Sequence, residues 1–259
     1  MTQQPLAFIH PDAKIGKDVV ISPFSYIYDD VEIGDGTVIE PNVTIMPGAR
    51  IGKNCHIFPG AVISAIPQDL KFAGEHTTTE IGDNTVIREC VTIHRGTVDK
   101  MTTKVGKNCL LMGYVHIAHD CIVGDNCIFA NYAALSGHCV IGNFVIIEGK
   151  AGAQQFMHVG DHAFIGGGTF IRKNVPPFVK AAEEPIQYIG VNSVGLARRG
   201  FAEEKIRQIQ DIYRLIFLQK GVLQKDALEM VRTQIPQSEE RDMILSFIEN
   251  SPNGIIKKP

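Results

Sequence analysis

Large aliphatic residues recur at every sixth position along most of the chain, and this period constrains the fold more than any other feature. The series begins at Ile9, continues through Ile15 to Ile63, resumes at Ile81 and ends at Ile171. An α-helix repeats its buried face about every 3.6 residues and a β-strand about every 2, so neither element alone produces a period of six. The sequence therefore predicts a repeat architecture in which very short strands alternate with turns.

A longer repeat of 18 residues is superimposed on the hexads. Glycine recurs at Gly16, Gly34 and Gly52, and again from Gly106 to Gly160. Three hexads thus form one coil, and one corner of each coil prefers glycine, which has no Cβ to obstruct a tight turn. This pattern predicts an all-β solenoid, a triangular parallel β-helix. It resembles the hexapeptide repeat of left-handed β-helix proteins, and the left hand is what that resemblance implies, since parallel crossovers are usually right-handed.

The spacing of the glycines lengthens twice, which indicates two insertions. Gly52 and Gly82 are 30 residues apart, and Gly82 and Gly106 are 24 apart. A solenoid accommodates extra residues only as loops that project from a corner, and such loops often carry function. We therefore expect external loops at about 64–80 and 95–104.

The hexad pattern ends near Pro176, and the rest of the chain has a different character. We expect a β-helical domain over residues 1–175. Over residues 176–259 we expect a linker, reaching Gly200, and then a C-terminal α-helical domain that covers the last coil. Apolar residues at helical spacing predict helices in three stretches, 206–217, 225–234 and 239–249.

Charge and composition argue against several classes of protein. The 259 residues include 25 Lys and Arg against 28 Asp and Glu, a net charge of −3, which does not favour a nucleic-acid partner. No run of about 18 apolar residues is present, so we expect no membrane span, and the first residues do not resemble a signal peptide. Five of the six cysteines occupy the small inward position of a hexad, so we expect inert, buried thiols in a reducing cytoplasm.

The 18-residue repeat also places the histidines. Residues 18 apart, or 24 apart across the second insertion, stack on successive coils, and this stacking gathers five polar residues around one corner: His94, His119, Asp120, His138 and Gln155. His116 is close in sequence on the preceding side of that corner. Histidine exchanges protons near neutral pH, and a neighbouring carboxylate can fix its tautomer. The cluster therefore predicts general acid–base chemistry, although a set of surface histidines on turns would have the same spacing.

A zinc site is the competing interpretation of this corner, because three imidazoles can bind zinc, as in the carbonic anhydrases built on left-handed β-helices. That family places its paired histidines five residues apart, whereas His116 and His119 are three apart. We therefore expect neither a metal nor another cofactor.

Four segments closely resemble one family of hexapeptide-repeat acyltransferases, the UDP-N-acetylglucosamine O-acyltransferases of lipid A biosynthesis. They are residues 91–97 (VTIHRGT), 116–121 (HIAHDC), 68–75 (QDLKFAGE) and 196–201 (LARRGF). The similarity covers nearly the whole chain, both insertions included. It implies that a 3-hydroxyacyl chain is transferred from acyl carrier protein to the 3-hydroxyl of UDP-N-acetylglucosamine, the first step of that pathway.

The resemblance also implies roles for individual residues. His119 matches the family's general base, Asp120 the carboxylate that orients it, and the N–H of Gly137 the donor to the oxyanion. Gly167 matches a position where glycine leaves the acyl groove long, so we expect a long acyl chain. The substrate-binding residues of the family match Asp69, Lys71, His94, His116, His138, Gln155, Asn192, Arg198 and Arg199.

At three positions this chain departs from the family pattern. Gln154 and Pro185 stand where the family often has histidine, and Val194 stands where it often has an acidic residue. Contacts of these three positions with the sugar or nucleotide are therefore not expected from the resemblance.

The resemblance further implies a homotrimer with its cleft between subunits. We expect acyl carrier protein, which is acidic, to dock on a basic surface, for which Arg172, Lys173, Arg198 and Arg199 are candidates. Three alternatives remain open: the related N-acyltransferase acting on UDP-3-O-acylglucosamine, a metal-dependent hydratase, and a structural solenoid without chemistry. The N-acyltransferase normally carries an extra N-terminal domain, and the hexads here begin too early to leave room for one.

Overall fold

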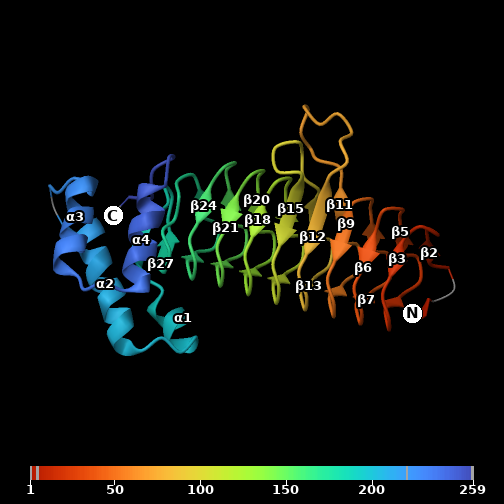
Figure 1. Cartoon of the computed structure of the whole chain (residues 1–259), viewed down its shortest axis with the longest axis horizontal. Coiled ribbons are helices and arrows are strands. Elements are labelled where there is room, and N and C mark those ends of the chain that lie inside the picture. The colour runs from red at the N-terminus through yellow and green to blue at the C-terminus, as the bar shows by residue number, and fades with distance from the viewer. Residues whose placement is uncertain (1, 4–5, 220, 258–259) are drawn as a thin grey trace.

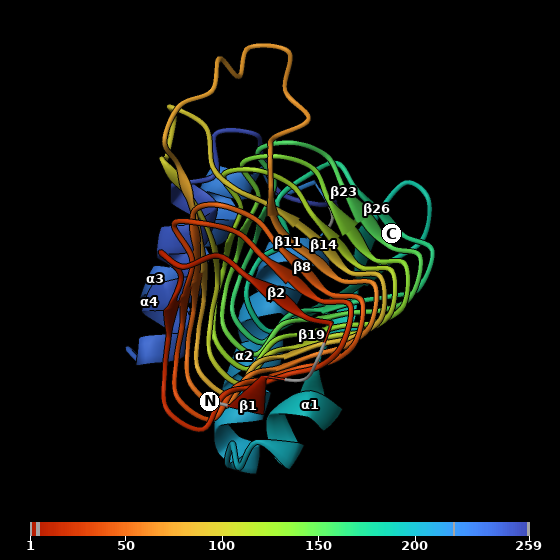
Figure 2. The ribbon, with the colours of Figure 1, turned by 90° about the vertical axis from the view of Figure 1, so that its right-hand side faces the viewer.

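The computed structural model describes residues 2–3, 6–219 and 221–257. Its main body is a three-sided column of short parallel strands, with helices at one end (Figure 1). Figure 2 looks along this column and shows its three flat sides. Buried side chains from all three sides fill the interior. The chain visits the sides in a fixed order, so every third strand belongs to the same sheet.

We name the three sides sheets A, B and C. Sheet A contains, in order, β1 (Thr2–Gln3), β4 (Val20–Ile21), β7 (Val38–Ile39), β10 (His56–Ile57), β13 (Val86–Ile87), β16 (Leu110–Leu111), β19 (Ile128–Phe129), β22 (Ile146–Ile147), β25 (Phe164–Ile165), β27 (Val179–Ala182) and β28 (Gln187–Val191). Sheet B contains β2 (Phe8–Ile9), β5 (Tyr26–Ile27), β8 (Thr44–Ile45), β11 (Val62–Ala65), β14 (Thr92–His94), β17 (His116–Ile117), β20 (Ala134–Leu135), β23 (Gly152–Ala153) and β26 (Phe170–Ile171). Sheet C contains β3 (Lys14–Ile15), β6 (Glu32–Ile33), β9 (Ala49–Ile51), β12 (Thr78–Ile81), β15 (Thr102–Val105), β18 (Ile122–Val123), β21 (Val140–Ile141) and β24 (His158–Val159).

The residues of the six-residue series fill the interior of the column. In the typical two-residue strand the first side chain faces outward and is half-buried, while the second faces inward and is fully buried. Equivalent isoleucines pair directly between coils, as Ile39 does with both Ile21 and Ile57 in sheet A. All three are completely buried. Because each strand satisfies its backbone hydrogen bonds through the coils above and below, two residues per side are enough to make a sheet.

The glycine-preferring corner lies where sheet C turns into sheet A, and its glycines are required by close packing of the coils. A Cβ on Gly34 would lie 2.6 Å from the backbone carbon of Gly52 in the next coil, and one on Gly124 would lie 2.7 Å from that of Gly142. These glycines do not have positive φ angles. Glycine is therefore required at this corner by the close contact of successive coils, and not by the geometry of the turn as the sequence suggested.

Both predicted insertions project from the edge where sheet B turns into sheet C. The first loop comprises residues 66–77, between β11 and β12, and the second comprises residues 95–101, between β14 and β15. They are shorter than the predicted 64–80 and 95–104 because the flanking strands β11, β12 and β15 lengthen to four residues at the loop bases. In Figure 1 they rise above the column as the orange and yellow loops.

The segment predicted as a linker contains regular structure, so that expectation was wrong. Strand β27 pairs parallel with β25, and β28 returns antiparallel to β27, which extends sheet A past the last coil. Helix α1 (Ser193–Arg198) follows. Pro176 and Pro177 end the hexads, but the edge of sheet A still offers backbone hydrogen bonds, and β27 takes them up. The division of the chain into domains at residue 175 stays a prediction.

Three further helices complete the C-terminal region, close to the predicted ranges: α2 (Glu203–Phe217), α3 (Gln224–Gln234) and α4 (Glu239–Glu249). Helix α2 buries one face through Ile209, Ile212 and Phe217. Tyr213 on the same face donates a hydrogen bond from its hydroxyl to the carbonyl oxygen of Pro177 at 2.5 Å. Among the described residues, no helix is long and apolar enough to cross a membrane.

Candidate active site

The edge between sheets B and C, here called the B–C edge, carries the predicted catalytic pair. Strand β17 ends at Ile117, and the turn to β18 then presents His119 and Asp120. Nδ1 of His119 lies 2.8 Å from Oδ2 of Asp120. His119 is 5% exposed and Asp120 is fully buried. The prediction that these two residues form a pair is thus realised within one turn of the chain.

The carboxylate of Asp120 is held by the second loop. Its Oδ1 accepts hydrogen bonds from the backbone N–H groups of Thr97 (2.9 Å) and Lys100 (3.2 Å), and its Oδ2 accepts from the hydroxyl of Thr97 (2.7 Å). Burial alone would raise the pKa of Asp120, but the hydrogen bonds from His119 and Thr97 lower it below its usual value. Asp120 therefore stays ionised and fixes His119 with its proton on Nδ1.

The backbone of Gly137 passes directly over the ring of His119. A Cβ at Gly137 would lie 2.6 Å from Cε1 and 2.8 Å from Nε2 of that ring, so only glycine fits. Within the described part of the chain, neither Nε2 of His119 nor the N–H of Gly137 has a hydrogen-bond partner. A free basic nitrogen and a free N–H donor thus lie side by side.

Two further histidines line the same edge. The rings of His94 and His116 meet edge-to-face with centroids 4.9 Å apart, and Nδ1 of His116 lies 2.8 Å from the hydroxyl oxygen of Thr92. Burial, with smaller contributions from His116 and His119, lowers the pKa of His94 from 6.5 to about 4. Burial and the neighbouring His119 also lower the pKa of His116. Both groups are therefore neutral at neutral pH and available as uncharged hydrogen-bonding groups.

Two small pockets open beside the catalytic pair, each with one wall from the first loop. One, of about 210 Å³, is lined by Gln68, Ser136 and Gln155 together with His116, Ala118, His119, Ala134, Leu135 and Gly137. The other, of about 280 Å³, is lined by Asp69, Lys71 and His138 together with Phe72, Glu75, Thr97, Val98, Asp99 and Phe156. The first loop therefore places four polar residues, Gln68, Asp69, Lys71 and Glu75, in the walls of these pockets.

The comparisons with known proteins agree along the whole chain. A family model for the second domain of UDP-N-acetylglucosamine O-acyltransferase matches residues 174–256, and the bacterial transferase hexapeptide model matches 12–45, 30–65 and 102–137. The acyl-carrier-protein–UDP-N-acetylglucosamine O-acyltransferase of Chlorobaculum parvum is 53% identical over 251 residues, 96% of this chain and 95% of that protein. Its counterpart from Myxococcus xanthus is 44% identical over 98% of both chains.

This chain belongs to the UDP-N-acetylglucosamine O-acyltransferase family. Among solved structures, the UDP-N-acetylglucosamine acyltransferase of Bacteroides fragilis superimposes with a TM-score of 0.96 at 50% identity, covering 98% of this chain and 99% of that one. The chain therefore shares the family's fold, a left-handed parallel β-helix followed by C-terminal helices, as the hexad pattern and the resemblance predicted.

Four residues matched to the family's substrate-binding positions lie away from His119 within one chain. Gly167 follows β25 and lies where sheet A turns into sheet B, with its N–H bonded to Glu148. Asn192 caps α1 and donates a hydrogen bond to the carbonyl of His162 at the edge between sheets C and A. Arg199 donates to the carbonyl of Phe144 at that same edge, and Arg198 is exposed beside it.

Figures 1 and 2 show the same separation: the two loops project on one side of the column, and α1 lies on the opposite side. A single copy of the chain thus assembles the catalytic pair and the loop residues, but does not bring α1 to them.

The positions that depart from the family pattern are also spread apart. Gln154 lies on the B–C edge next to Gln155, whereas Pro185 lies in the connection between β27 and β28. Val194 is exposed on α1. These three residues form no common site within the chain.

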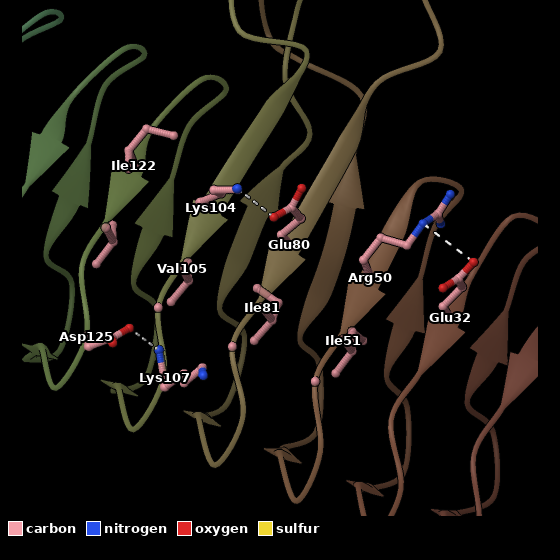
Figure 3. Close-up of a pocket in the computed structure, with 14 residues that line it drawn as sticks. Glu32, Arg50, Ile51, Glu80, Ile81, Lys104, Val105, Lys107, Ile122 and Asp125 are labelled. Carbon is pink, nitrogen blue, oxygen red and sulfur yellow. Dashed lines mark hydrogen bonds and ion pairs between the residues drawn. The ribbon is translucent and has the colours of Figure 1, made fainter.

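A larger hollow of about 630 Å³ lies on the outer face of sheet C, where Glu32, Arg50, Glu80 and Lys104 take part in ion pairs and Asp125 accepts a hydrogen bond from the backbone N–H of Lys107. Figure 3 shows Lys104 pairing with Glu80 at 2.9 Å and Arg50 approaching Glu32 at 3.9 Å. No histidine or cysteine lines it. We interpret it as a solvent-exposed row of ion pairs between coils and not as a catalytic site.

A metal interpretation of the B–C edge meets a chemical obstacle. Ligand atoms of His119, Asp120 and His138 all lie within 4.8 Å of one another. However, Nδ1 of His119 already binds Asp120 and Nδ1 of His138 already binds Asp99, while both oxygens of Asp120 accept hydrogen bonds. Among the described residues, Nε2 of both histidines remains free, so the obstacle lies at Asp120, whose oxygens would have to give up hydrogen bonds from His119, Thr97 or Lys100 to bind an ion.

Sequence reasoning missed three residues that hold the site: Thr97, Asp99 and Lys100. They lie in the second loop, whose conformation follows no repeat, so their partners could not be assigned by register. The signal that was present is the position of the insertion itself, which begins beside His94.

Proposed function

We propose that this protein transfers the acyl chain of a 3-hydroxyacyl carrier protein to the 3-hydroxyl of UDP-N-acetylglucosamine, the first step of lipid A biosynthesis. The names of the relatives that match 98% and 96% of the chain support this reaction. The single structural observation that carries the chemistry is the His119–Asp120 pair, whose free Nε2 lies beside the free N–H of Gly137.

The reaction proceeds by direct transfer. Nε2 of His119 accepts the proton of the sugar hydroxyl while the hydroxyl oxygen attacks the thioester carbonyl carbon. The N–H of Gly137 donates a hydrogen bond to the oxyanion of the tetrahedral intermediate, a contact that is typically worth about 3 kcal/mol. The carbon–sulfur bond then breaks, and the leaving thiolate takes the proton from Nε2. The imidazolium formed in between is stabilised by Asp120.

The first loop supplies the binding groups for the sugar nucleotide. Lys71 lines the pocket beside His138, where its ammonium group can pair with a phosphate. Asp69 accepts a hydrogen bond from the backbone N–H of Lys71 at 3.0 Å, which shapes the loop and leaves the second carboxylate oxygen for the sugar. His116 and Gln155 line the neighbouring pocket, on the side of the acyl donor and the sugar ring, and His94 packs against His116 behind it.

The active unit is a homotrimer in which neighbouring chains complete each other's sites. In one chain the outer face of sheet A is a half-buried stripe that is apolar except at His56, whereas the outer face of sheet C is charged from Lys14 to Lys104. The apolar residues of this stripe are Val20, Val38, Val86, Leu110, Ile128, Ile146 and Phe164. Packing of sheet A on sheet B of the next copy would cover it and would place α1 of one chain beside the B–C edge of its neighbour. Gly167, Asn192, Arg198 and Arg199 would then reach the cleft.

A cytoplasmic location and a carrier-protein docking surface complete the proposal. Six free cysteines, five of them buried, fit a reducing compartment. Of the basic candidates, Arg172 pairs with Glu184 at 2.7 Å and Lys173 donates to the carbonyl of Asn253, although both are exposed. Arg198 is exposed and, among the described residues, has no side-chain partner, so it is the first candidate contact for the acidic carrier.

The decisive experiment is an acyl-transfer assay with UDP-N-acetylglucosamine and a panel of 3-hydroxyacyl carrier proteins of different chain length. We expect an ester product at the 3-hydroxyl and a preference for long chains, since Gly167 leaves the groove open. A preference for chains near ten carbons would overturn the long-chain expectation alone. Activity only on the amine of UDP-3-O-acylglucosamine, or zinc-dependent hydration of carbon dioxide, would replace the whole proposal.

A further inference from the structure

The ring of His138 is held on three sides in the wall of the pocket that contains Lys71. Its Nδ1 lies 2.9 Å from Oδ2 of Asp99, its face stacks on Phe156 with centroids 4.5 Å apart, and its edge meets the ring of His119 at 5.0 Å. The side chain of His138 is only 13% exposed. An imidazole that merely faced solvent would not be fixed in this way.

Asp99 is the nearer of two carboxylates beside Nδ1 of His138, because Oδ2 of Asp120 lies 3.9 Å from that nitrogen and already accepts hydrogen bonds from His119 and Thr97. An ionised carboxylate only accepts hydrogen bonds, so Nδ1 of His138 must donate, and Nε2 is left for a ligand. Within the described part of the chain, Nε2 of His138 has no hydrogen-bond partner. Both His138 and Asp99 line the pocket that also contains Lys71. His138 thus belongs to the pocket assigned above to the sugar nucleotide, and Nε2 is the ring nitrogen that Asp99 leaves free.

The second loop therefore holds two imidazoles through two carboxylates. Thr97 and Lys100 fix Asp120, which orients His119, and Asp99, between them in sequence, orients His138. Asp99 has no evident role in the fold, because its side chain is 57% exposed and its only side-chain partner among the described residues is His138. Its position in the loop makes chemical sense only through that histidine.

We propose that Asp99 is a positioning residue for substrate binding: it fixes the tautomer and orientation of His138 so that Nε2 accepts a hydrogen bond from a hydroxyl of the sugar-nucleotide acceptor. This inference rests on the proposed function for the identity of the acceptor. Asp99 does not touch the reacting atoms, so its loss weakens acceptor binding more than it slows the chemical step.

The test compares Asp99→Asn and Asp99→Glu in the full-length enzyme, with kcat and KM measured separately for UDP-N-acetylglucosamine. We expect Asp99→Asn to raise KM about tenfold, which corresponds to about 1.4 kcal/mol, with kcat changed less than about threefold. Asp99→Glu keeps a carboxylate and should recover part of the loss. Asp12→Asn is the matched control: it removes an exposed carboxylate near His10 on the B–C edge of the first coil and should leave both constants unchanged.

A second measurement does not depend on activity. Nitrogen-15 NMR of the imidazoles should show hydrogen on Nδ1 of His138 in the wild type and a shift of the tautomer population toward Nε2–H in Asp99→Asn. An unchanged tautomer, or an unchanged KM, would overturn the inference and leave the proposed function standing. A wild-type enzyme that does not acylate UDP-N-acetylglucosamine at all would instead overturn the proposed function, while the NMR result would still report on Asp99 and His138.

Discussion

At the scale of single residues, the site depends on the contacts that fix the ring of His119 and leave only Nε2 of that ring without a partner among the described residues. Asp120 takes one ring nitrogen, Gly137 covers one face of the ring, and His138 meets its edge. Only Nε2 and the N–H of Gly137 remain for a substrate. Each of these restraints can be removed by one substitution with a separate expected effect.

Replacing the base should abolish turnover without unfolding the protein. His119→Ala removes the imidazole that Asp120 orients beside the N–H of Gly137, so we expect kcat to fall by about 10²–10⁴. Asp120→Asn should also lower kcat, because the amide can no longer hold the Nδ1–H tautomer. Steady-state transfer assays measure both effects, and circular dichroism checks the fold. Near-normal turnover by His119→Ala would contradict the assigned role.

Gly137→Ala tests the close approach of the backbone to the catalytic ring. The new methyl group would lie 2.6 Å from Cε1 of His119, so the ring must move. A displacement of about 1 Å typically costs about 10² in rate, and we expect a loss of kcat of that size. The melting temperature should change little, because a side chain rather than backbone gives way. A variant as active as the wild type would show that His119 does not need its present position.

The buried, neutral state of His94 makes stability depend on pH. The pKa of His94 in the native state, about 4, lies below the ordinary value of 6.5. Between these two pH values the unfolded chain is protonated at His94 and the native chain is not. The contribution of His94 to the free energy of unfolding is therefore complete above pH 6.5 and is lost progressively as the pH falls from 6.5 to about 4. Urea unfolding at several pH values should show this decline, and His94→Gln should reduce it. His10→Gln, which replaces a more exposed histidine, should have the wild-type pH dependence, and an equal change in both variants would contradict the assignment to His94.

At the scale of elements, the close approach of successive backbones at the corner between sheets C and A limits which residues can occupy that corner. A Cβ on Gly124 would meet the backbone of Gly142 at 2.7 Å, whereas one on Gly113 would meet only the side-chain amide of Asn131, at 3.1 Å. We therefore expect Gly124→Ala to lower the free energy of unfolding by about 1–3 kcal/mol and Gly113→Ala to have a smaller effect. Thermal denaturation of the two variants compares them, and equal losses would mean that coil contact does not explain the glycines.

The repetitive coils could be predicted from the sequence, whereas the conformation of the loops and the strands after the last coil could not. The six-residue series placed Ile39 and Ile57 inside the column because register along a repeat is a local property of the chain. The same register placed His119 below Gly137, so the core of the site was predictable. The partners of Thr97 and Asp99 were not, because a loop without a repeat takes its conformation from tertiary contacts. The strands β27 and β28 were missed because their pairing depends on an edge that the preceding coils create.

At the scale of the whole molecule, the proposed trimer predicts that two inactive variants can complement each other in mixed trimers. In hybrids of His119→Ala and Arg199→Ala chains, some clefts would combine the intact His119 of one copy with the intact Arg199 of its neighbour. Random mixing should restore roughly a quarter of wild-type sites. Co-expression of the two variants followed by a transfer assay measures this. Each variant alone should be nearly inactive, and hybrids no better than the parents would show that α1 and the B–C edge of different chains do not share a site.

The regular stacking of the column sets how its parts can diverge. Each coil contacts only the coils before and after it, so the height between the two loops and the C-terminal helices is counted in whole rungs of about 4.8 Å. Loss or gain of 18 residues would leave every remaining rung intact while sliding α1 past the loops by one step. Related chains can therefore change the distance between the loops and α1 only in steps of one coil. Finer changes require the replacement of a side chain within a coil.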